Sequence, residues 1–422
     1  MRTPKYRHKA SVQMLSWLDH RQGAAKILVM DYEQTHPWLR FSLSLSSADS
    51  RLWLLLGEVA SKVEHLSGVP LRPDVADELH RIYLAKGALA TTAIEGNSLS
   101  DDQAQQLING KLELPKSRQY LQQEVQNIVD ICNHEARQLL GPDVGEHRLC
   151  PELIKEYNRD VLKDLSHSED TVPGEIRRHS VVVGSVYRGA PAINCEYLLG
   201  RLCTWLNSAE FLPPDEEYLI PFALIKAIVA HVYLAWIHPF GDGNGRTARL
   251  IEFHILFANG IPLPSAHLLS DHYNRTRTEY YRELAKASAS GGDLLPFISY
   301  ALQGFLDGIR EQIALVRTQQ MRVAWENYVH GCFRSLKNST TQKRRRELVF
   351  DLTGFSENDG WVDVSSIHLL TPKLAREYAT AGDRMVQRDL NALAKMGLIL
   401  RRHGKVKANW EVIQAFLPRR VD

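Results

Sequence analysis

Residues 238–249 read His-Pro-Phe-Gly-Asp-Gly-Asn-Gly-Arg-Thr-Ala-Arg, and the rest of the 422-residue chain can be interpreted outward from this stretch. It brings a titratable base, a carboxylate, an amide and two arginines together with Gly241, Gly243 and Gly245. Glycine allows positive φ angles and close approach of a ligand, so consecutive backbone N–H groups can point into one concavity that holds an anion. The stretch therefore predicts a phosphate-binding turn.

A helix is expected directly after the turn, because no helix breaker occurs between Thr247 and the pair Asn259-Gly260. The anion would then lie at a helix N-terminus, where unpaired N–H groups and the helix dipole both favour negative charge. Arg246 and Arg249 are three residues apart and so share one face of this helix. Their guanidinium groups can bind successive phosphates of a nucleotide.

Asp242 and His238 predict the chemistry of the site. A carboxylate beside a phosphate is unfavourable by charge unless a divalent cation lies between them, so we expect Asp242 to bind Mg²⁺ together with substrate phosphates. His238 has an ordinary pKa near neutrality and is the natural base for an acceptor hydroxyl.

The stretch resembles the signature of the Fic family (filamentation induced by cAMP), HPFx[D/E]GN[G/K]RxxR, at every fixed position. The resemblance implies transfer of AMP from ATP to a protein hydroxyl of Ser, Thr or Tyr, with His238 as the base and Asp242 as the Mg²⁺ ligand. It further implies that Arg246 holds the region of the α- and β-phosphates and that Arg249 binds the γ-phosphate. The anion hole would be lined by Gly241, Gly243, Asn244 and Gly245.

Other reactions within the same family stay open. Phosphorylation, UMP transfer, phosphocholine transfer and removal of AMP by a water molecule near Glu95 all use related loops. Asp242 and Gly245 favour AMP transfer over the phosphorylating variants, in which Lys replaces the second of these positions.

Residues 91–97, Thr-Thr-Ala-Ile-Glu-Gly-Asn, end a helix expected from Asp74 to about Ile94. They resemble the family's inhibitory motif, [S/T]xxxE[G/N], with Thr91, Glu95 and Gly96 in the fixed positions. Its place before the signature implies the family's class II, in which Glu95 would pair with Arg249 and exclude the γ-phosphate. The alternative is a plain helix end with a glutamate beside a glycine.

β-Branched residues replace helix formers in residues 173–184, which predicts an extended hairpin. The segment resembles the Fic flap, an edge strand that aligns the backbone of a target protein through Val181, Val182 and Val183. A plain surface hairpin is the alternative.

Tyr280 and Tyr281 fall in a helix predicted over residues 277–289. The segment resembles the adenine-side helix of the family, which implies stacking of the base on one of these tyrosines. Both could equally be core residues.

Composition is ordinary for a globular protein, with 44% hydrophobic and 24% charged residues and a net charge of +2. The five cysteines show neither CxxC pairing nor metal-ligand spacing, and the first residues lack the apolar run of a signal peptide, so a reducing cytoplasm is expected. The apolar run from Leu219 to Ile237 carries Lys226 and His231, which favours a buried core helix over a membrane span. We therefore expect no membrane association.

The C-terminal part predicts a second domain. A helix after Pro372, another over 383–396 and the basic turn Arg401–Lys407 between short strands resemble a winged helix-turn-helix. Residues 341–422 hold 15 Lys and Arg against 10 Asp and Glu, a net charge of about +5. This charge favours duplex DNA as a partner, with protein docking or dimerisation as the alternative. The basic residues expected to contact phosphates are Arg384, Arg388, Arg401, Arg402, Lys405 and Lys407.

The predicted fold is mainly α, with a Fic-type helical core, a small β-hairpin flap and a C-terminal winged-helix (α+β) domain. Its predicted divisions are an N-terminal extension (1–50), a helical region with the inhibitory helix (51–120), the Fic core (121–320), a helix and linker (321–346) and the winged helix (347–422). The predicted function is Mg²⁺-dependent AMP transfer from ATP to target proteins and to the chain itself, as a homodimer, under inhibition by Glu95. The rival from another class is a DNA-binding regulator whose Fic core only senses a nucleotide, although a sensor needs no base such as His238.

Overall fold

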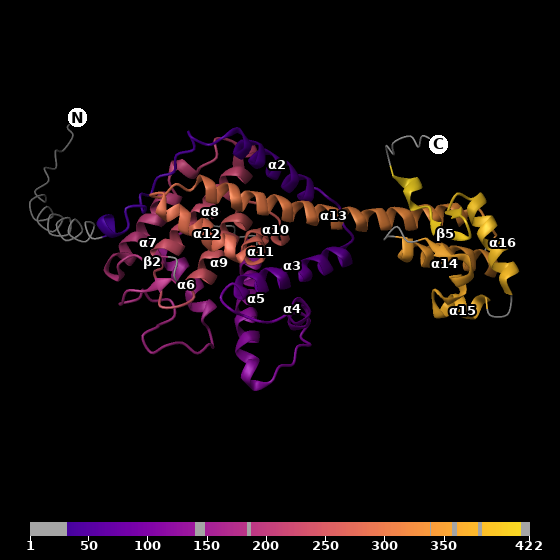
Figure 1. Ribbon diagram of the computed structural model, residues 1–422, viewed down its shortest axis with the longest axis horizontal. Coiled ribbons are helices and arrows are strands. Elements are labelled where there is room, and N and C mark those ends of the chain that lie inside the picture. Colours follow the sequence, from indigo (N-terminus) through magenta and orange to yellow (C-terminus); the bar gives the residue numbers. More distant parts are fainter. Residues whose placement is uncertain are drawn as a thin grey trace, which may run out of the picture. The chain divides into compact units, whose positions relative to one another are not determined.

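The structure, a computed structural model, describes residues 32–139, 148–183, 187–337, 339–356, 361–378 and 382–414. The chain divides into two compact units, Met1–Ile313 and Ala314–Asp422, each with its own hydrophobic core. Most described residues are helical (Figure 1), as the sequence predicts. Of the predicted N-terminal extension, residues 1–31 lie outside the described residues.

The first unit is built from helices joined by short loops. Its helices are α2 (Ser50–Ser67), α3 (Pro73–Ala93), α4 (Asp101–Ile108), α5 (Gln119–Leu139), α6 (Pro151–Val161), α7 (Ala192–Leu206), α8 (Leu219–Ile237), α9 (Asn244–Ala258), α10 (Leu263–Ala266), α11 (Leu268–Arg275), α12 (Arg277–Ala289) and the first part of α13 (Leu295–Arg334). Short 3-10 turns occur at Lys116–Arg118, Ala209–Phe211 and Glu216–Tyr218. Proline in the first turn starts α3 and α6, where its missing N–H costs nothing.

Helix α8 forms the centre of this unit and packs along α9 (Figure 1). Nearly every residue from Ala223 to Ile237 is buried, because α8 is apolar on all sides. Among the described residues α8 alone is long and apolar enough to cross a membrane, but 78% of its most apolar window is buried inside the protein. This burial confirms the prediction of a core helix, whose C-terminal end delivers His238 to the loop.

A two-stranded antiparallel hairpin lies before α7. Its strands are β1 (Val182–Val183) and β2 (Tyr187–Arg188), with Val182 paired to Arg188 and Val183 to Tyr187. A hairpin is therefore present, but only its first strand falls within the predicted segment 173–184. Residues 173–180 form turns instead of a strand, apart from one antiparallel bridge between Ile176 and Phe240.

The second unit combines the end of α13 and further helices with a small sheet. Its elements are the end of α13, α14 (Thr340–Ser356), β3 (Val362–Asp363), the 3-10 turn Val364–Leu369, α15 (Pro372–Tyr378), α16 (Gly382–Lys395), β4 (Ile399–Arg402), β5 (Lys405–Ala408) and the 3-10 turn Trp410–Ile413. The sheet is antiparallel with the order β3-β5-β4. The predicted hairpin around the basic turn is present.

Residues 321–346 differ from the predicted helix and linker. Trp325, Val329 and Phe333 of α13 belong to the core of the second unit, and the basic run 340–346 is the start of α14. Asp389 of α16, fully buried, explains why the run is ordered: it accepts hydrogen bonds from Arg344 Nε (2.8 Å) and Arg345 Nε (2.7 Å). The boundary between the units accordingly falls earlier, at Ile313.

Candidate active site

His238 occupies the first position after α8 and has left-handed backbone angles, φ 50° and ψ 58°. Its N–H still donates to the carbonyl of Leu234 at 2.9 Å, so the residue caps the helix. Burial, together with the nearby Arg177 guanidinium, lowers the pKa of His238 to about 4, although the carboxylates of Glu95 and Asp242 oppose the shift. The imidazole is therefore neutral at pH 7 and can accept a proton.

The three glycines of the loop serve two purposes. Gly243 alone has a positive φ, 75°, and it lies at the N-cap of α9. At Gly241 a Cβ would lie 2.6 Å from Thr171 Oγ1, and at Gly245 it would collide with Oε1 of Glu95. Positive φ is thus found at one glycine of the three. At the other two, neighbouring atoms approach so closely that a larger side chain would not fit.

Asn244 stabilises the turn through its side chain. Its Oδ1 accepts from the N–H of Phe240 and its Nδ2 donates to the carbonyl of Phe240, both at 2.9 Å. Phe240 itself is buried in the core. This pairing uses one of the two Nδ2–H groups of Asn244, so the residue can hold the turn and still belong to the anion hole expected from the sequence.

Arg249 and Glu95 form a direct ion pair. Arg249 Nη2 donates to Glu95 Oε1 at 2.7 Å and to the backbone carbonyl of Thr91 at 2.8 Å, and the Arg249 side chain is only 1% exposed. Burial raises the pKa of the Glu95 carboxyl, but the Arg249 guanidinium outweighs it and the net pKa is lowered. The structure thus brings together Glu95 and Arg249 as predicted, whereas Thr91 takes part through its carbonyl.

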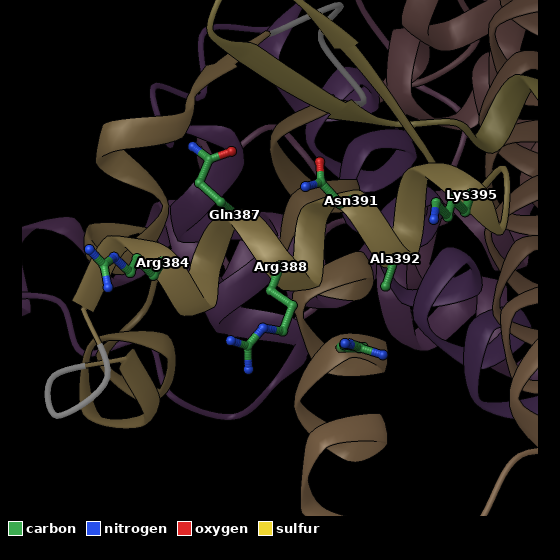
Figure 2. A pocket seen from close by; sticks show the side chains of 7 residues that line it. Arg384, Gln387, Arg388, Asn391, Ala392 and Lys395 are labelled. Carbon is green, nitrogen blue, oxygen red and sulfur yellow. The ribbon is translucent and has the colours of Figure 1, made fainter.

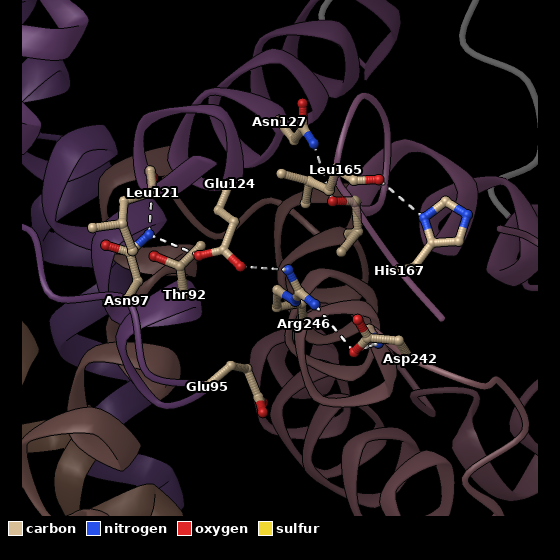
Figure 3. A network of polar contacts seen from close by, with 12 residues as sticks. Thr92, Glu95, Asn97, Leu121, Glu124, Asn127, Leu165, His167, Asp242 and Arg246 are labelled. Atoms are coloured by element: carbon tan, nitrogen blue, oxygen red, sulfur yellow. Dashed lines mark hydrogen bonds and ion pairs between the residues drawn. The ribbon is translucent and has the colours of Figure 1, made fainter. Parts of the chain in front are cut away.

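Arg246 belongs to a separate polar network that reaches α5 (Figure 3). Its Nη1 donates to Glu124 Oε1 and its Nη2 to Asp242 Oδ1, each at 3.2 Å. The other oxygen of Glu124 accepts from Asn97 Nδ2 at 2.8 Å. The two arginines, predicted to share one helix face, therefore contact different acidic partners.

Sequence reasoning missed Glu124. It lies within a regular helix, 122 residues before Arg246, and nothing in its local sequence distinguishes it from the other polar residues of α5. Only the packing of α5 near the loop shows its relation to the site.

Asp242 fits the predicted role in Mg²⁺ binding by its donor type and accessibility. Its side chain is 50% exposed, and Oδ1 accepts from the N–H of Gly243 at 2.5 Å. Among the residues that the structure describes, no group of three or more His, Cys, Asp or Glu side chains could hold a metal by itself. One carboxylate together with substrate phosphates is a common way for proteins to bind Mg²⁺, so the residues present suit that ion.

The two candidate tyrosines differ in position. Tyr280 is buried, its hydroxyl lies 3.0 Å from Nε2 of His231, and its ring stacks on Tyr273 at 4.9 Å. Tyr280 is therefore packed as a core residue, the alternative that the sequence left open. Tyr281 is half-buried, and stacking of adenine on it stays a prediction.

The flap segment lies against the catalytic loop. The N–H of Gly189 donates to the carbonyl of Val181 at 3.2 Å, and a Cβ on Gly189 would lie 3.0 Å from Cβ of His238. The backbone of β1, with Val182 and Val183, thus belongs to a hairpin whose base touches His238.

Comparison with known proteins gives one family match and several relatives. A model of the Fic/DOC family matches residues 148–256. "Protein adenylyltransferase fic-1" of Caenorhabditis briggsae is 28% identical over 294 residues, which cover 66% of this chain and 50% of the relative. "Protein adenylyltransferase Fic" of Aedes aegypti is 31% identical over 175 residues, 39% of this chain and 32% of the relative. The chain spans about half the length of the nematode relatives it matches.

Solved structures agree in fold. A Fic family protein from Desulfovibrio desulfuricans G20 superposes with a TM-score of 0.53 at 19% identity, covering 87% of this chain and 98% of that one. Fic-1 from Caenorhabditis elegans gives a TM-score of 0.52 at 26% identity, covering 63% and 73%. The Fic/DOC family match over residues 148–256 includes the loop that carries His238 and both arginines, so this part of the chain is similar to that family.

Proposed function

We propose that the chain is an Mg²⁺-dependent protein adenylyltransferase that is autoinhibited by Glu95, as in class II of the family. One observation carries the proposal: the Glu95 carboxylate pairs with Arg249 and lies against Gly245 at the N-terminus of α9. A site that holds a carboxylate between a guanidinium and helix N–H groups can also hold a phosphate. The adenylyltransferase names of the relatives support the same reading.

The expected reaction is an in-line displacement. Neutral His238 takes the proton of the acceptor hydroxyl, whose oxygen attacks the α-phosphorus as the bond to the β-phosphate oxygen breaks and pyrophosphate leaves. Arg246, Arg249 and the N-terminus of α9 hold the phosphates, so positioning and charge stabilisation provide the rate. Mg²⁺ at Asp242 would neutralise phosphate charge. The edge of β1 that is not paired with β2 would align the target backbone by strand pairing.

We extend the proposal to the acceptor and the compartment. We propose that the chain also modifies itself within a homodimer, because a dimer keeps a second copy of the chain close to the active site as an acceptor. A reducing cytoplasm is consistent with five cysteines that are all free in the structure.

The donor test uses Glu95→Gly protein with Mg²⁺ and ATP labelled at either the α- or the γ-phosphate. Removing the carboxylate frees Arg249, so we expect α-label on protein at least roughly tenfold above wild type, as loss of a charge-assisted contact allows. Retention of γ-label instead would identify a phosphotransferase. Equal α-labelling by wild type and Glu95→Gly would reject the inhibitory role.

A double variant provides the control. Arg249→Ala removes the partner of the carboxylate and of the γ-phosphate together, so it should not reproduce the gain. Glu95→Gly combined with Arg249→Ala should be as inactive as Arg249→Ala alone, since the two residues act through one contact.

To test the reverse reaction, pre-labelled protein is incubated with wild-type chain and release of AMP is measured.

A second candidate function is favoured by one surface of the second unit. We propose that this unit is a winged helix that binds duplex DNA. An open groove of about 640 Å³ along α16 is lined by Arg345, Arg384, Gln387, Arg388, Asn391, Ala392 and Lys395 (Figure 2). Arg384 and Arg388 point from one side of the helix and are exposed, as contacts to phosphates require.

We propose that the DNA contacts involve Arg384 and Arg388 of α16 more than the basic residues of the wing. Arg401 donates to the side chains of Asn391 and, at 2.8 Å, of Gln387. Lys407 is buried, with Nζ 3.0 Å from Glu411 Oε1 and 5.5 Å from the Trp361 ring centre. Lys407 therefore supports the wing from inside, and Arg401 is exposed but bonded to α16. Arg402 and Lys405 are exposed on the wing.

Binding to a mixed-sequence duplex at several salt concentrations tests this surface. Arg384→Gln with Arg388→Gln should weaken binding and reduce the slope of log affinity against log salt by about 2, roughly 0.9 per lost phosphate contact. Arg334→Gln with Lys337→Gln removes the same charge from exposed sites outside the groove and serves as the control. Equal losses in both double variants would mean that net charge, not the groove, determines binding.

A further inference from the structure

Arg177 is a buried cation beside the catalytic loop. Only 3% of its surface is exposed, and burial lowers the pKa of its guanidinium. Its described hydrogen bonds all go to backbone carbonyls: Nε donates to His238 (2.7 Å), Nη1 to His179 (2.6 Å), and Nη2 to Ala190 and, at 3.5 Å, to Ile237. One side chain thus joins three segments of backbone.

Two of these carbonyls, Ile237 and His238, are at the C-terminal end of α8. Carbonyl groups there have no partner within the helix, and the negative end of the helix dipole favours a cation. His238 also has positive φ, a conformation that non-glycine residues adopt at a cost. Arg177 therefore stabilises the turn that presents the His238 side chain.

The other two carbonyls, His179 and Ala190, flank the flap hairpin. Backbone bonds reinforce the same junction, since the N–H of Arg177 donates to Pro239 (3.0 Å) and that of Ala190 to Trp236 (3.3 Å). A Cβ on Gly189 would lie 3.1 Å from Nη2 of Arg177, so the base of the flap is packed directly on the guanidinium. The Arg177 guanidinium therefore holds both the flap and the turn that carries His238.

We infer that Arg177 is a positioning residue that fixes His238 and the flap in register, so that the base and the edge strand meet the same acceptor hydroxyl. This inference rests on the proposed transfer reaction. The role requires a planar guanidinium, because its N–H donors point in different directions and can reach separate carbonyls. A lysine ammonium can reach one or two of them. The phosphate site, built from the N-terminus of α9 and its arginines, has no contact with this group among the described residues.

Arg177→Met and Arg177→Lys in the Glu95→Gly background test the inference. Arg177→Met should lower the self-labelling rate at saturating ATP by roughly a hundredfold, because misplacement by about 1 Å has that effect. Affinity for a non-hydrolysable ATP analogue should stay within about twofold, since the anion site is untouched. Arg177→Lys should recover part of the rate. Amide hydrogen exchange of Gly189, Ala190 and His238 should accelerate in Arg177→Met.

Arg178→Met is the matched control, because Arg178 is the exposed neighbour of Arg177. It should leave rate, affinity and exchange unchanged. Parallel losses of ATP affinity and labelling in Arg177→Met, or failure of both Arg177 variants to fold, would overturn the inference by making Arg177 a general structural residue. If the Glu95→Gly parent itself does not label, the proposed function fails, whereas exchange and analogue affinity still report on Arg177.

Discussion

At the scale of single residues, the position of His238 keeps its imidazole neutral at pH 7. The left-handed turn places its ring at the end of an apolar helix, and burial next to Arg177 disfavours the protonated form. A neutral imidazole near a hydroxyl can remove its proton without first losing one itself.

Replacing His238 with Ala should reduce α-label transfer by about 10²- to 10⁴-fold, the usual contribution of a general base. The affinity for Mg-ATP should remain nearly unchanged, because the base acts on the acceptor and the phosphate site is preserved. Labelling kinetics and calorimetry with an ATP analogue measure the two effects. His134→Ala, at an exposed position on α5, is the control, and wild-type labelling by His238→Ala would reject the mechanism.

His267 should make stability depend on pH. Burial lowers its pKa to about 3, with a smaller effect of His80, so as pH falls the unfolded chain binds the proton first. The stability contributed by neutral His267 is therefore present above about pH 6.5 and is lost toward pH 3, by up to about 1.4 kcal/mol per pH unit. Denaturant unfolding from pH 7 to 4 should show a smaller slope in His267→Gln. The exposed His65→Gln should not change the slope.

Each residue of the loop 238–249 could be given a candidate role from the sequence because these residues are contiguous, and those roles stay predictions. The contacts of Glu124 with Arg246 and of Arg177 with His238 could not be predicted, since the two residues of each pair lie 122 and 61 positions apart in the sequence. The burial of Tyr280 was equally hidden, because a tyrosine pair on a helix has the same pattern whether it faces the core or a ligand.

At the scale of elements, a close contact in the middle of α3 fixes the position of this helix, and with it the position of Glu95 just after its end. Gly87 packs so tightly on His267, which stacks on Phe253 of α9 at 4.5 Å, that an added Cβ would collide with the imidazole. The absence of a side chain at Gly87 thus sets the distance between α3 and the loop before α11.

Gly87→Ala should force α3 outward, lower the free energy of unfolding by about 1–3 kcal/mol through overpacking, and raise self-labelling by loosening the Glu95–Arg249 pair. Thermal unfolding and α-label incorporation measure the two effects. Gly57→Ala on α2 is the matched helical control, because nothing lies within 4 Å of its added Cβ. A destabilised Gly87→Ala protein with wild-type labelling would show that α3 position does not control the pair.

Most helices could be predicted because apolar residues recur at helical spacing and proline or glycine ends each run. The basic run 340–346 could not, because its helix depends on Asp389 rather than on local pattern. Part of the hairpin expected over 173–184 is absent for a related reason: Ile176 bridges to Phe240 and the Arg177 side chain bonds to the His238 carbonyl, both just after α8.

At the scale of the whole molecule, two separate cores predict two unfolding transitions. Leu390→Ala, fully buried in the second core, should destabilise only that unit by about 2–5 kcal/mol. Leu302→Ala in the first core is the reciprocal variant. Scanning calorimetry should show one shifted transition in each, and ATP-analogue affinity should fall only with Leu302→Ala. A single shifted transition common to both would mean that the units unfold cooperatively.

The loop after α3 is connected to both arginines of the candidate phosphate site, to Arg249 directly and to Arg246 through Glu124. Glu95 binds Arg249, and Asn97, two residues later, binds Glu124, which in turn holds Arg246. Thermodynamic linkage is reciprocal, so a ligand that draws either arginine away must weaken the hold on the same loop by as much as that loop weakens the ligand. Under the proposed inhibition by Glu95, the ATP concentration would therefore regulate the enzyme as well as supply its substrate: the strength of the contacts made by this loop would set the concentration at which ATP displaces Glu95.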